Sequence, residues 1–106
     1  MPSTLNKSEQ LVADTLDRLH VRWEYEPRLF ELEHDEEGRC KRGFRPDFYL
    51  PDHDLYIEVT WARQTYTTDK RSRARLLRAR YPGVRLAILY RRDFVDIRSR
   101  LLELLK

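Results

Sequence analysis

Residues 44–61, FRPDFYLPDHDLYIEVTW, decide the fold of this chain. Apolar and polar residues alternate in two runs, 44–50 and 55–61, on either side of the short segment 51–54. Alternation with a period of two is typical of β-strands, and the Pro and Asp residues between the runs favour a tight turn. The stretch therefore predicts a β-hairpin.

The alternation also predicts which side chains share a face of this hairpin. Asp47 groups with Arg45 and Tyr49 on the first strand, and Glu58 falls on the same side of the second. Two carboxylates on a half-buried face repel each other unless a proton or a cation lies between them. Carboxylate oxygens with an open position suit Mg²⁺, an ion that serves phosphate chemistry. The opposite face is expected to hold Phe44, Pro46, Phe48, Leu50, Leu55, Ile57, Val59 and Trp61.

Outward from the hairpin, hydrophobic periodicity and turn residues predict the other elements. They are a helix over 4–20, a strand over 21–25, a strand over 28–33 that is either separate or a continuation past Pro27, a polar turn or hairpin loop over 34–43, a helix over 68–81 that starts near Thr68 and Asp69, a strand over 84–90 buried on both faces, and a last helix capped by Asp93. This order, α-β-β-β-α-β-α, predicts a single α/β domain over 1–106 with a central mixed sheet flanked by helices.

Glu9 lies on the apolar stripe of the first predicted helix. Leu5, Val12, Leu16 and Leu19 share this stripe at helical spacing. Two interpretations remain open for the Glu9 carboxylate. It faces inward as a functional acid, or it lies near the start of the helix and reaches solvent.

Charge is divided unevenly along the chain. Residues 1–60 contain 8 Lys and Arg against 14 Asp and Glu, whereas residues 61–106 contain 13 against 4. The basic residues concentrate in 61–80, where Arg suits contact with phosphate. This favours a polyanion such as DNA over the alternative, a solvated helix balanced by the acidic residues 31–37. The expected DNA-contacting residues are Arg45, Arg63, Gln64, Arg71, Arg73, Arg75 and Arg78.

Composition excludes several classes of protein. The chain has 106 residues, of which 41% are hydrophobic, enough for one modest core rather than a disordered chain. No apolar run approaches the ~20 residues that cross a bilayer, and the N-terminal stretch lacks the apolar segment of a secretory signal. The single cysteine, Cys40, rules out an internal disulfide and a cysteine-based zinc cluster. A reducing, cytoplasmic location is therefore expected.

Pro46-Asp47, followed after ten residues by Glu58-Val59-Thr60, resembles the PD-(D/E)XK nuclease signature. The order of elements resembles the restriction-endonuclease-like core of that superfamily. The resemblance implies a divalent-metal-dependent endonuclease that hydrolyses DNA phosphodiester bonds, with Mg²⁺ or Mn²⁺ as cofactor. It also implies that Asp47 and Glu58 bind the metal, that the Val59 carbonyl adds a ligand, and that Glu9 is a direct ligand or supports one.

Thr60 departs from the family pattern, which has a lysine there to orient or activate the attacking water. Threonine has no positive charge, so either the site is inactive or another cation replaces the lysine, while the Thr60 hydroxyl still holds a water. We expect Lys70 to be the replacement, because helical spacing from Ala74 puts it on the sheet-facing side of the second helix, near its start. Lesser candidates are Arg63, Gln64 and Lys41.

Two alternatives to a nuclease remain. One is a catalytically inactive module that binds nucleic acid, and the other is a protein-interaction module with the same fold. In either nucleic-acid role, a domain of this size covers little DNA, so we expect a homodimer or a partner protein that supplies specificity. No membrane partner is expected.

Overall fold

The computed structural model describes residues 5–61 and 64–106, and the side chains of all of these except 64–67. Within these ranges the chain is a mixed α/β fold. Its elements follow in the order α1 (Lys7–Arg18), β1 (Glu24–Tyr25), β2 (Phe30–His34), β3 (Cys40–Phe44), β4 (Phe48–Leu50), β5 (Leu55–Thr60), α2 (Gln64–Arg80), β6 (Leu86–Tyr90), a 3₁₀ helix (Arg91–Asp96) and α3 (Ile97–Leu104).

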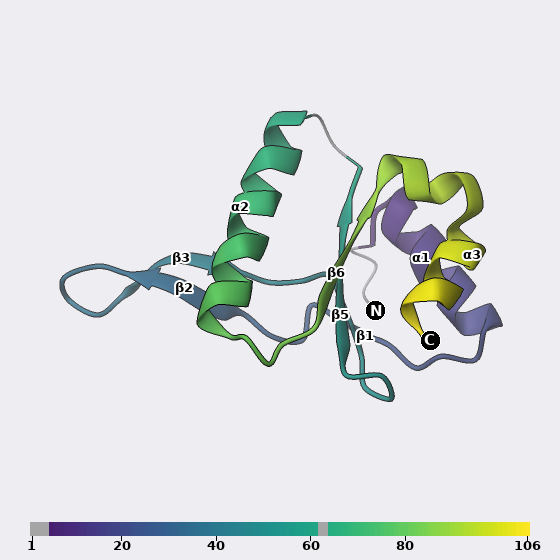
Figure 1. Ribbon diagram of the computed structural model, residues 1–106, viewed down its shortest axis with the longest axis horizontal. Helices are drawn as coiled ribbons and strands as arrows, with labels where there is room; N and C mark the ends of the chain where they lie inside the picture. The colour runs from purple at the N-terminus through teal and green to yellow at the C-terminus, as the bar shows by residue number, and fades with distance from the viewer. Residues whose placement is uncertain (1–4, 62–63) are drawn as a thin grey trace.

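A mixed sheet in the strand order β1-β4-β5-β6 forms the centre of the fold (Figure 1). Strand β4 pairs antiparallel with β1 and β5, and β5 pairs parallel with β6. The pairing of Leu50 with Leu55 and of Phe48 with Ile57 confirms the predicted hairpin around 51–54. Helix α2 makes the long connection that a parallel pair requires.

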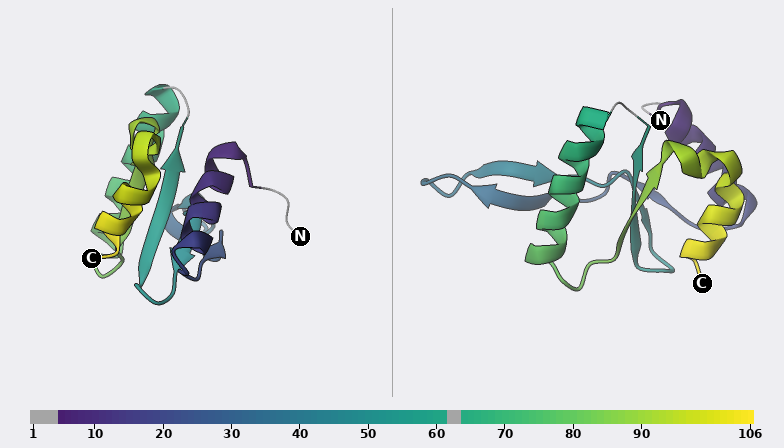
Figure 2. Two further views of the ribbon diagram at one scale, coloured as in Figure 1. Left: turned by 90° about the vertical axis from the view of Figure 1, so that its right-hand side faces the viewer. Right: turned by 45° about the horizontal axis from the view of Figure 1, so that its top comes forward.

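Helices cover both faces of this sheet. Helices α1 and α3 lie on one side and α2 lies on the other (Figures 1 and 2). An apolar cluster fills each interface. The first contains Val12, Leu16, Phe48, Leu50, Ile57, Val59, Leu89 and Leu101, and the second contains Phe30, Leu32, Phe44, Tyr56, Ala74 and Leu77. Adjacent residues of β5 therefore contribute to opposite clusters, as the alternation predicts.

Strands β2 and β3 form a separate hairpin that projects beyond α2 (Figure 1). The prediction that 34–43 is a loop is wrong for residues 40–43, which belong to β3 and pair with β2. Pairing with a neighbouring strand overrides the polar composition of this segment. The turn itself is short, and the Asp35 carboxylate accepts hydrogen bonds from the backbone N–H groups of Glu37 and Arg39.

The predicted strand over 44–50 is divided in the structure. Phe44 ends β3 and belongs to the second apolar cluster, whereas Phe48 starts β4 and belongs to the first. The expectation that Phe44 and Phe48 share a face is therefore wrong. Pro46 lies between the two strands, where its missing N–H prevents a continuous ladder.

Several predicted helix and strand ends also shift. Asn6 caps α1 through the backbone N–H of Glu9, so that helix is shorter than 4–20. The strand over 21–25 is reduced to the two residues of β1. Helix α2 begins at Gln64 rather than near Thr68, and ends before Pro82-Gly83 as predicted.

The C-terminal prediction is wrong about the cap. Asp96 caps α3 by accepting from the Ser99 N–H, whereas the Asp93 carboxylate accepts from the Tyr90 N–H at the start of the 3₁₀ helix. Strand β6 contributes to both apolar clusters, through Ala87 and Leu89 on one face and Leu86 and Ile88 on the other, as predicted for a strand covered on both faces. Because β6 lies at the edge of the sheet, three of its five residues are only partly buried. Among the described helices, none combines the length and hydrophobicity needed to cross a bilayer.

Candidate active site

Asp47 and Glu58 meet where the β4–β5 hairpin opens. Both are buried, and each carboxylate accepts a hydrogen bond from the backbone of the opposite strand. The Asp47 N–H donates to Glu58 Oε1 over 3.2 Å, and the Val59 N–H donates to Asp47 Oδ2 over 2.8 Å. The predicted pairing of the two carboxylates on one face is thus confirmed by direct contacts.

Lys70 reaches this pair from the N-terminal half of α2. Its ammonium lies 2.8 Å from Glu58 Oε2 and 2.8 Å from the Val59 carbonyl oxygen. The Lys70 side chain is 29% exposed, whereas that of Glu58 is only 5% exposed. The helical spacing therefore predicted the location of Lys70 correctly. The Lys70 ammonium lies beside Glu58, although Lys70 comes from α2 and the position where the family has its lysine, Thr60, is on β5.

Glu9 faces inward, which decides between the two interpretations of this residue. Its side chain is buried at the start of α1, where Glu9 Oε1 accepts from the Asn6 N–H over 3.1 Å and from the Tyr25 hydroxyl over 2.9 Å. The first of these bonds belongs to the capping box that starts the helix. Glu9 also forms a hydrogen bond with Asp47. One residue therefore both caps α1 and brings a third carboxyl to the site.

The electrostatics of the site favour a proton on Asp47. Burial, followed by the charge of Glu58, raises the pKa of Asp47 to about 8, against a smaller opposing effect of the Val59 N–H. Burial also raises the pKa of Glu58, although the Lys70 ammonium opposes that rise. Burial and the bond to Glu9 raise the pKa of Tyr25. The site therefore has an excess of buried acid over base, an arrangement that favours binding of a cation.

A recess of about 520 Å³ opens between the start of α1 and the end of β5. Glu9, Val59, Trp61 and Lys70 contribute to its wall. Asp47 and Glu58 do not line it, but two of its lining residues contact them directly, Lys70 through Glu58 and Val59 through Asp47. The recess therefore gives the Lys70 side chain a path to solvent.

The oxygen ligands available at this site are of the chemical type that a hard divalent ion prefers. They are the carboxylates of Asp47 and Glu58 and the carbonyl of Val59, with Glu9 beside them. In the described part of the chain, no three acidic, histidine or cysteine side chains form a ready-made ion site. Backbone N–H groups and Lys70 already donate to several of these oxygens, so an ion would use the lone pairs that these donors leave free.

Thr60 is 2% exposed, and its hydroxyl has no hydrogen-bond partner among the described residues. A buried, unsatisfied hydroxyl is rare in folded proteins and often accompanies an ordered water or a function. The expectation that this hydroxyl holds a water stays a prediction.

The predicted DNA-contacting arginines divide into two groups. Arg71 and Arg75 are exposed and donate to no backbone carbonyl among the described residues, whereas Arg45, Arg73 and Arg78 donate to the carbonyls of Glu26, Gly43 and Leu86, although Arg45 and Arg78 are exposed as well. Arg73 and Arg78 therefore help to hold α2 against β3 and β6. Arg63 lies outside the described residues, and only the backbone of Gln64 is described.

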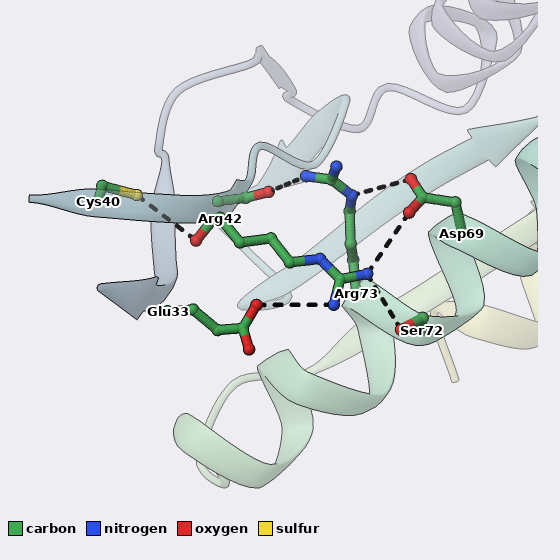
Figure 3. A network of polar contacts seen from close by, with 7 residues as sticks. Glu33, Cys40, Arg42, Asp69, Ser72 and Arg73 are labelled. Carbon is green, nitrogen blue, oxygen red and sulfur yellow. Dashed lines mark hydrogen bonds and ion pairs between the residues drawn. The ribbon is translucent and has the colours of Figure 1, made fainter. Parts of the chain in front are cut away.

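Figure 3 shows a contact network that the sequence interpretation missed. Arg42 on β3 reaches Asp69 and Ser72 on α2 and Glu33 on β2, and Arg73 shares Asp69 with it. No periodicity signals the contacts of Arg42 with α2, because these partners are far apart in sequence and come together only through the β2–β3 hairpin. Lys41 is exposed on the same strand and forms no ion pair with a site carboxylate among the described residues.

Comparison with family models, with curated proteins and with solved structures found no match to this chain. The functional argument therefore depends on the geometry of the site and on the resemblance of its motif.

Proposed function

We propose that this protein is a divalent-metal-dependent nuclease that hydrolyses DNA phosphodiester bonds, with a restriction-endonuclease-like arrangement of its core. One observation carries the proposal. Three carboxyl groups, from Glu9, Asp47 and Glu58, gather with the Lys70 ammonium beside a solvent-accessible recess. Buried acids that outnumber their basic partners destabilise a fold, so their convergence favours a functional site.

The topology around the acids supports the same proposal. Strands β4 and β5 carry Asp47 and Glu58 at their open end, α1 supplies Glu9, and the crossover helix α2 supplies Lys70 before the parallel strand β6. Without the separate β2–β3 hairpin, the order is α1-β1-β4-β5-α2-β6, which supports the α-β-β-β-α-β core that the Pro46-Asp47 and Glu58-Val59-Thr60 motif implies.

In this proposal, Asp47, Glu58 and the Val59 carbonyl hold the metal, and Glu9 supports Asp47. The bound ion supplies Lewis-acid stabilisation of phosphate charge and a more acidic water. A cation held here would favour the ionised form of Asp47, because burial and the repulsion of Glu58 are what raise its pKa. Glu9, fixed by Asn6 and Tyr25, holds the Asp47 side chain in position.

Lys70 takes the role that the family assigns to a lysine at the Thr60 position. An ammonium has three N–H donors, and Glu58 and the Val59 carbonyl accept from Lys70 in the described part of the chain. A further donor therefore remains for a water or a phosphate oxygen that enters the recess. The positive charge of Lys70 would stabilise the negative charge that develops on a phosphoryl group during attack.

Exposed arginines outside the recess supply the affinity for the nucleic-acid backbone. Arg45 follows β3, whereas Arg71 and Arg75 lie on α2. Guanidinium groups bind phosphate through paired hydrogen bonds and without reading sequence, so affinity for DNA should fall as salt rises.

The experiment is cleavage of a panel of supercoiled, linear, single-stranded and branched DNA, with Mg²⁺ or Mn²⁺ and with EDTA. The matched control is the double variant Asp47→Asn/Glu58→Gln, which keeps the shape of both side chains. Metal-dependent cleavage that the double variant lacks would support the proposal. DNA binding without cleavage in every metal would reject it in favour of the inactive nucleic-acid-binding module, an outcome that the uncharged Thr60 side chain would then explain. Neither binding nor cleavage would favour a protein-interaction module.

A further inference from the structure

Trp61 is a large aromatic side chain left partly exposed beside the proposed site. It directly follows β5, three residues after Glu58, and is 44% exposed. It lines the recess that contains Lys70 and Glu9, and it also lines a second surface hollow of about 600 Å³ on its other side. Trp61 therefore separates the acid site from this second hollow.

One arginine side chain lies near the ring of Trp61, and two lie near the ring of Tyr90, which is on the adjacent strand β6 opposite Thr60. The Arg91 guanidinium lies 5.4 Å from the centroid of the Trp61 ring, and Arg92 and Arg71 lie 4.6 Å and 5.2 Å from that of Tyr90. None of these three arginines forms an ion pair with an acid among the described residues. Their charges are thus available to an anionic ligand.

The Trp61 ring is held in place before any ligand binds. The ring of Phe94, from the 3₁₀ helix, packs edge-on against it with the ring centres 4.9 Å apart. A ring with a fixed orientation loses little conformational freedom when a ligand stacks on it. The Arg91 side chain, in contrast, is exposed, and its cation–π contact with the ring is the one interaction recorded for it among the described residues.

A nucleotide is the ligand that satisfies both features of this surface. Its base offers a flat π-face to Trp61, and its phosphate accepts from Arg91 and Arg92. A base within a continuous duplex is stacked between its neighbours, so its face is not available to a protein ring. An unpaired base can stack at a surface tryptophan without that cost.

We propose that Trp61, with Arg91 and Arg92, is a stacking site for an unpaired nucleotide next to the phosphate to be cleaved. The inference rests on the proposed nuclease function and names its substrate class: DNA with a single-stranded segment at the cleavage point, rather than continuous duplex. When the base stacks, it takes the place of the Arg91 guanidinium over the ring, and Arg91 turns to the phosphate.

Binding without metal tests this surface separately from the chemistry. Fluorescence anisotropy in EDTA would compare a labelled oligothymidine with a blunt duplex of the same length. Trp61→Ala should weaken binding of the oligothymidine about tenfold and change duplex binding less than twofold, because stacking is lost only where the base is unpaired. Trp61→Phe should restore most of the affinity. Arg98→Ala, an exposed arginine on α3 outside the hollow, is the matched control for general loss of charge.

Cleavage with Mg²⁺ or Mn²⁺ provides the second readout. Trp61→Ala should reduce the ratio of single-stranded or branched DNA cleavage to duplex cleavage. An equal loss on both substrates, or no loss on either, would overturn the stacking site and leave the nuclease proposal intact. Selective loss of oligothymidine binding in a protein that never cleaves would retain the stacking site and reject the nuclease. If Trp61→Ala does not fold, Arg91→Ala decides, since it should weaken oligothymidine binding more than Arg98→Ala does.

Discussion

At the end of β5, three acidic side chains gather beside a single ammonium, whereas at the contact between α2 and β3 two acids, Glu33 and Asp69, are matched by two arginines, Arg42 and Arg73. Glu58 is almost fully buried beside Lys70, and Asp47 keeps a raised pKa. Asp69, in contrast, is half exposed and accepts from both Arg42 and Arg73 (Figure 3). One region buries an excess of like charge, and the other balances its charges at the surface.

This difference indicates that the acid site serves function, whereas the α2–β3 contact serves assembly of the fold. Balanced, partly exposed ion pairs contribute little to stability and mainly fix how two elements lie against each other. A buried excess of carboxyls reduces stability, so a sequence that keeps it needs another reason to do so. The acid site is therefore the region to test for chemistry, and the α2–β3 contact is the region to test for folding.

Asp47→Asn should have opposite effects on activity and on stability. We expect metal-dependent cleavage to fall by a factor on the order of 10³, because a charged metal ligand is lost. The free energy of unfolding without metal should rise by about 1 kcal/mol near pH 8, since the amide has no charge to bury. Cleavage assays and urea unfolding in EDTA measure the two effects. A variant that loses both activity and stability would mean that Asp47 is a structural residue.

Lys70→Ala should lower both the rate of cleavage and the free energy of unfolding. Cleavage should fall by a factor on the order of 10² if the ammonium stabilises charge at the phosphate. Unfolding free energy should fall by about 1 to 2 kcal/mol, a value reduced for the partial exposure of Lys70, because Glu58 then lacks its partner. Lys70→Arg is the matched control, since it retains the charge. Unchanged cleavage in Lys70→Ala would remove this residue from the proposed mechanism.

Asp47 and Lys70 also show how much of the candidate site could be predicted from the sequence. Strand alternation and the 51–54 turn placed Asp47 and Glu58 together, and helical spacing placed Lys70 toward them, because each is a local period with a fixed geometry. Helical spacing also put Glu9 on an apolar stripe but left open whether its carboxylate faces inward. The Arg42–Asp69 contact was not predictable in this way. It depends on the β2–β3 hairpin, whose polar strand Cys40–Phe44 is formed by pairing rather than by its own hydrophobic pattern.

Boundaries were predicted less well than contacts. The strand over 44–50 is interrupted at Pro46, and the last helix uses Asp96 rather than Asp93 as its cap. Pro46 and Asp93 are the residues that misled the prediction. Pro46 is compatible with a strand or with a break between strands, and Asp93 can cap an α-helix or a 3₁₀ helix. Tertiary packing chooses between such alternatives, and a period in the sequence does not record that choice.

The pH dependence of stability should separate the two regions as well. The folded pKa of Asp47, about 8, is above its ordinary value of 3.8, so the folded protein holds more protons than the unfolded one between these values. Stability without metal should therefore fall as pH rises from 4 to 8, by on the order of 2 kcal/mol. Urea unfolding in EDTA at several pH values measures this slope, which Asp47→Asn should reduce. The same slope in wild type and variant would assign it to other groups.

Arg73→Ala tests the balanced region and should have the smallest effect. Arg73 joins Asp69 on α2 to the Gly43 carbonyl of β3, so its removal should lower the free energy of unfolding by about 1 kcal/mol and leave cleavage by the folded protein unchanged. Arg75→Ala is the matched control, because Arg75 lies two residues away on the exposed side of α2 and has no ion pair among the described residues. Arg75→Ala should leave stability unchanged and weaken DNA binding at low salt. If Arg73→Ala instead weakened DNA binding as much as Arg75→Ala without loss of stability, the α2–β3 contact would itself belong to the DNA-binding surface, and the distinction between a chemical and a structural charge cluster would fail there.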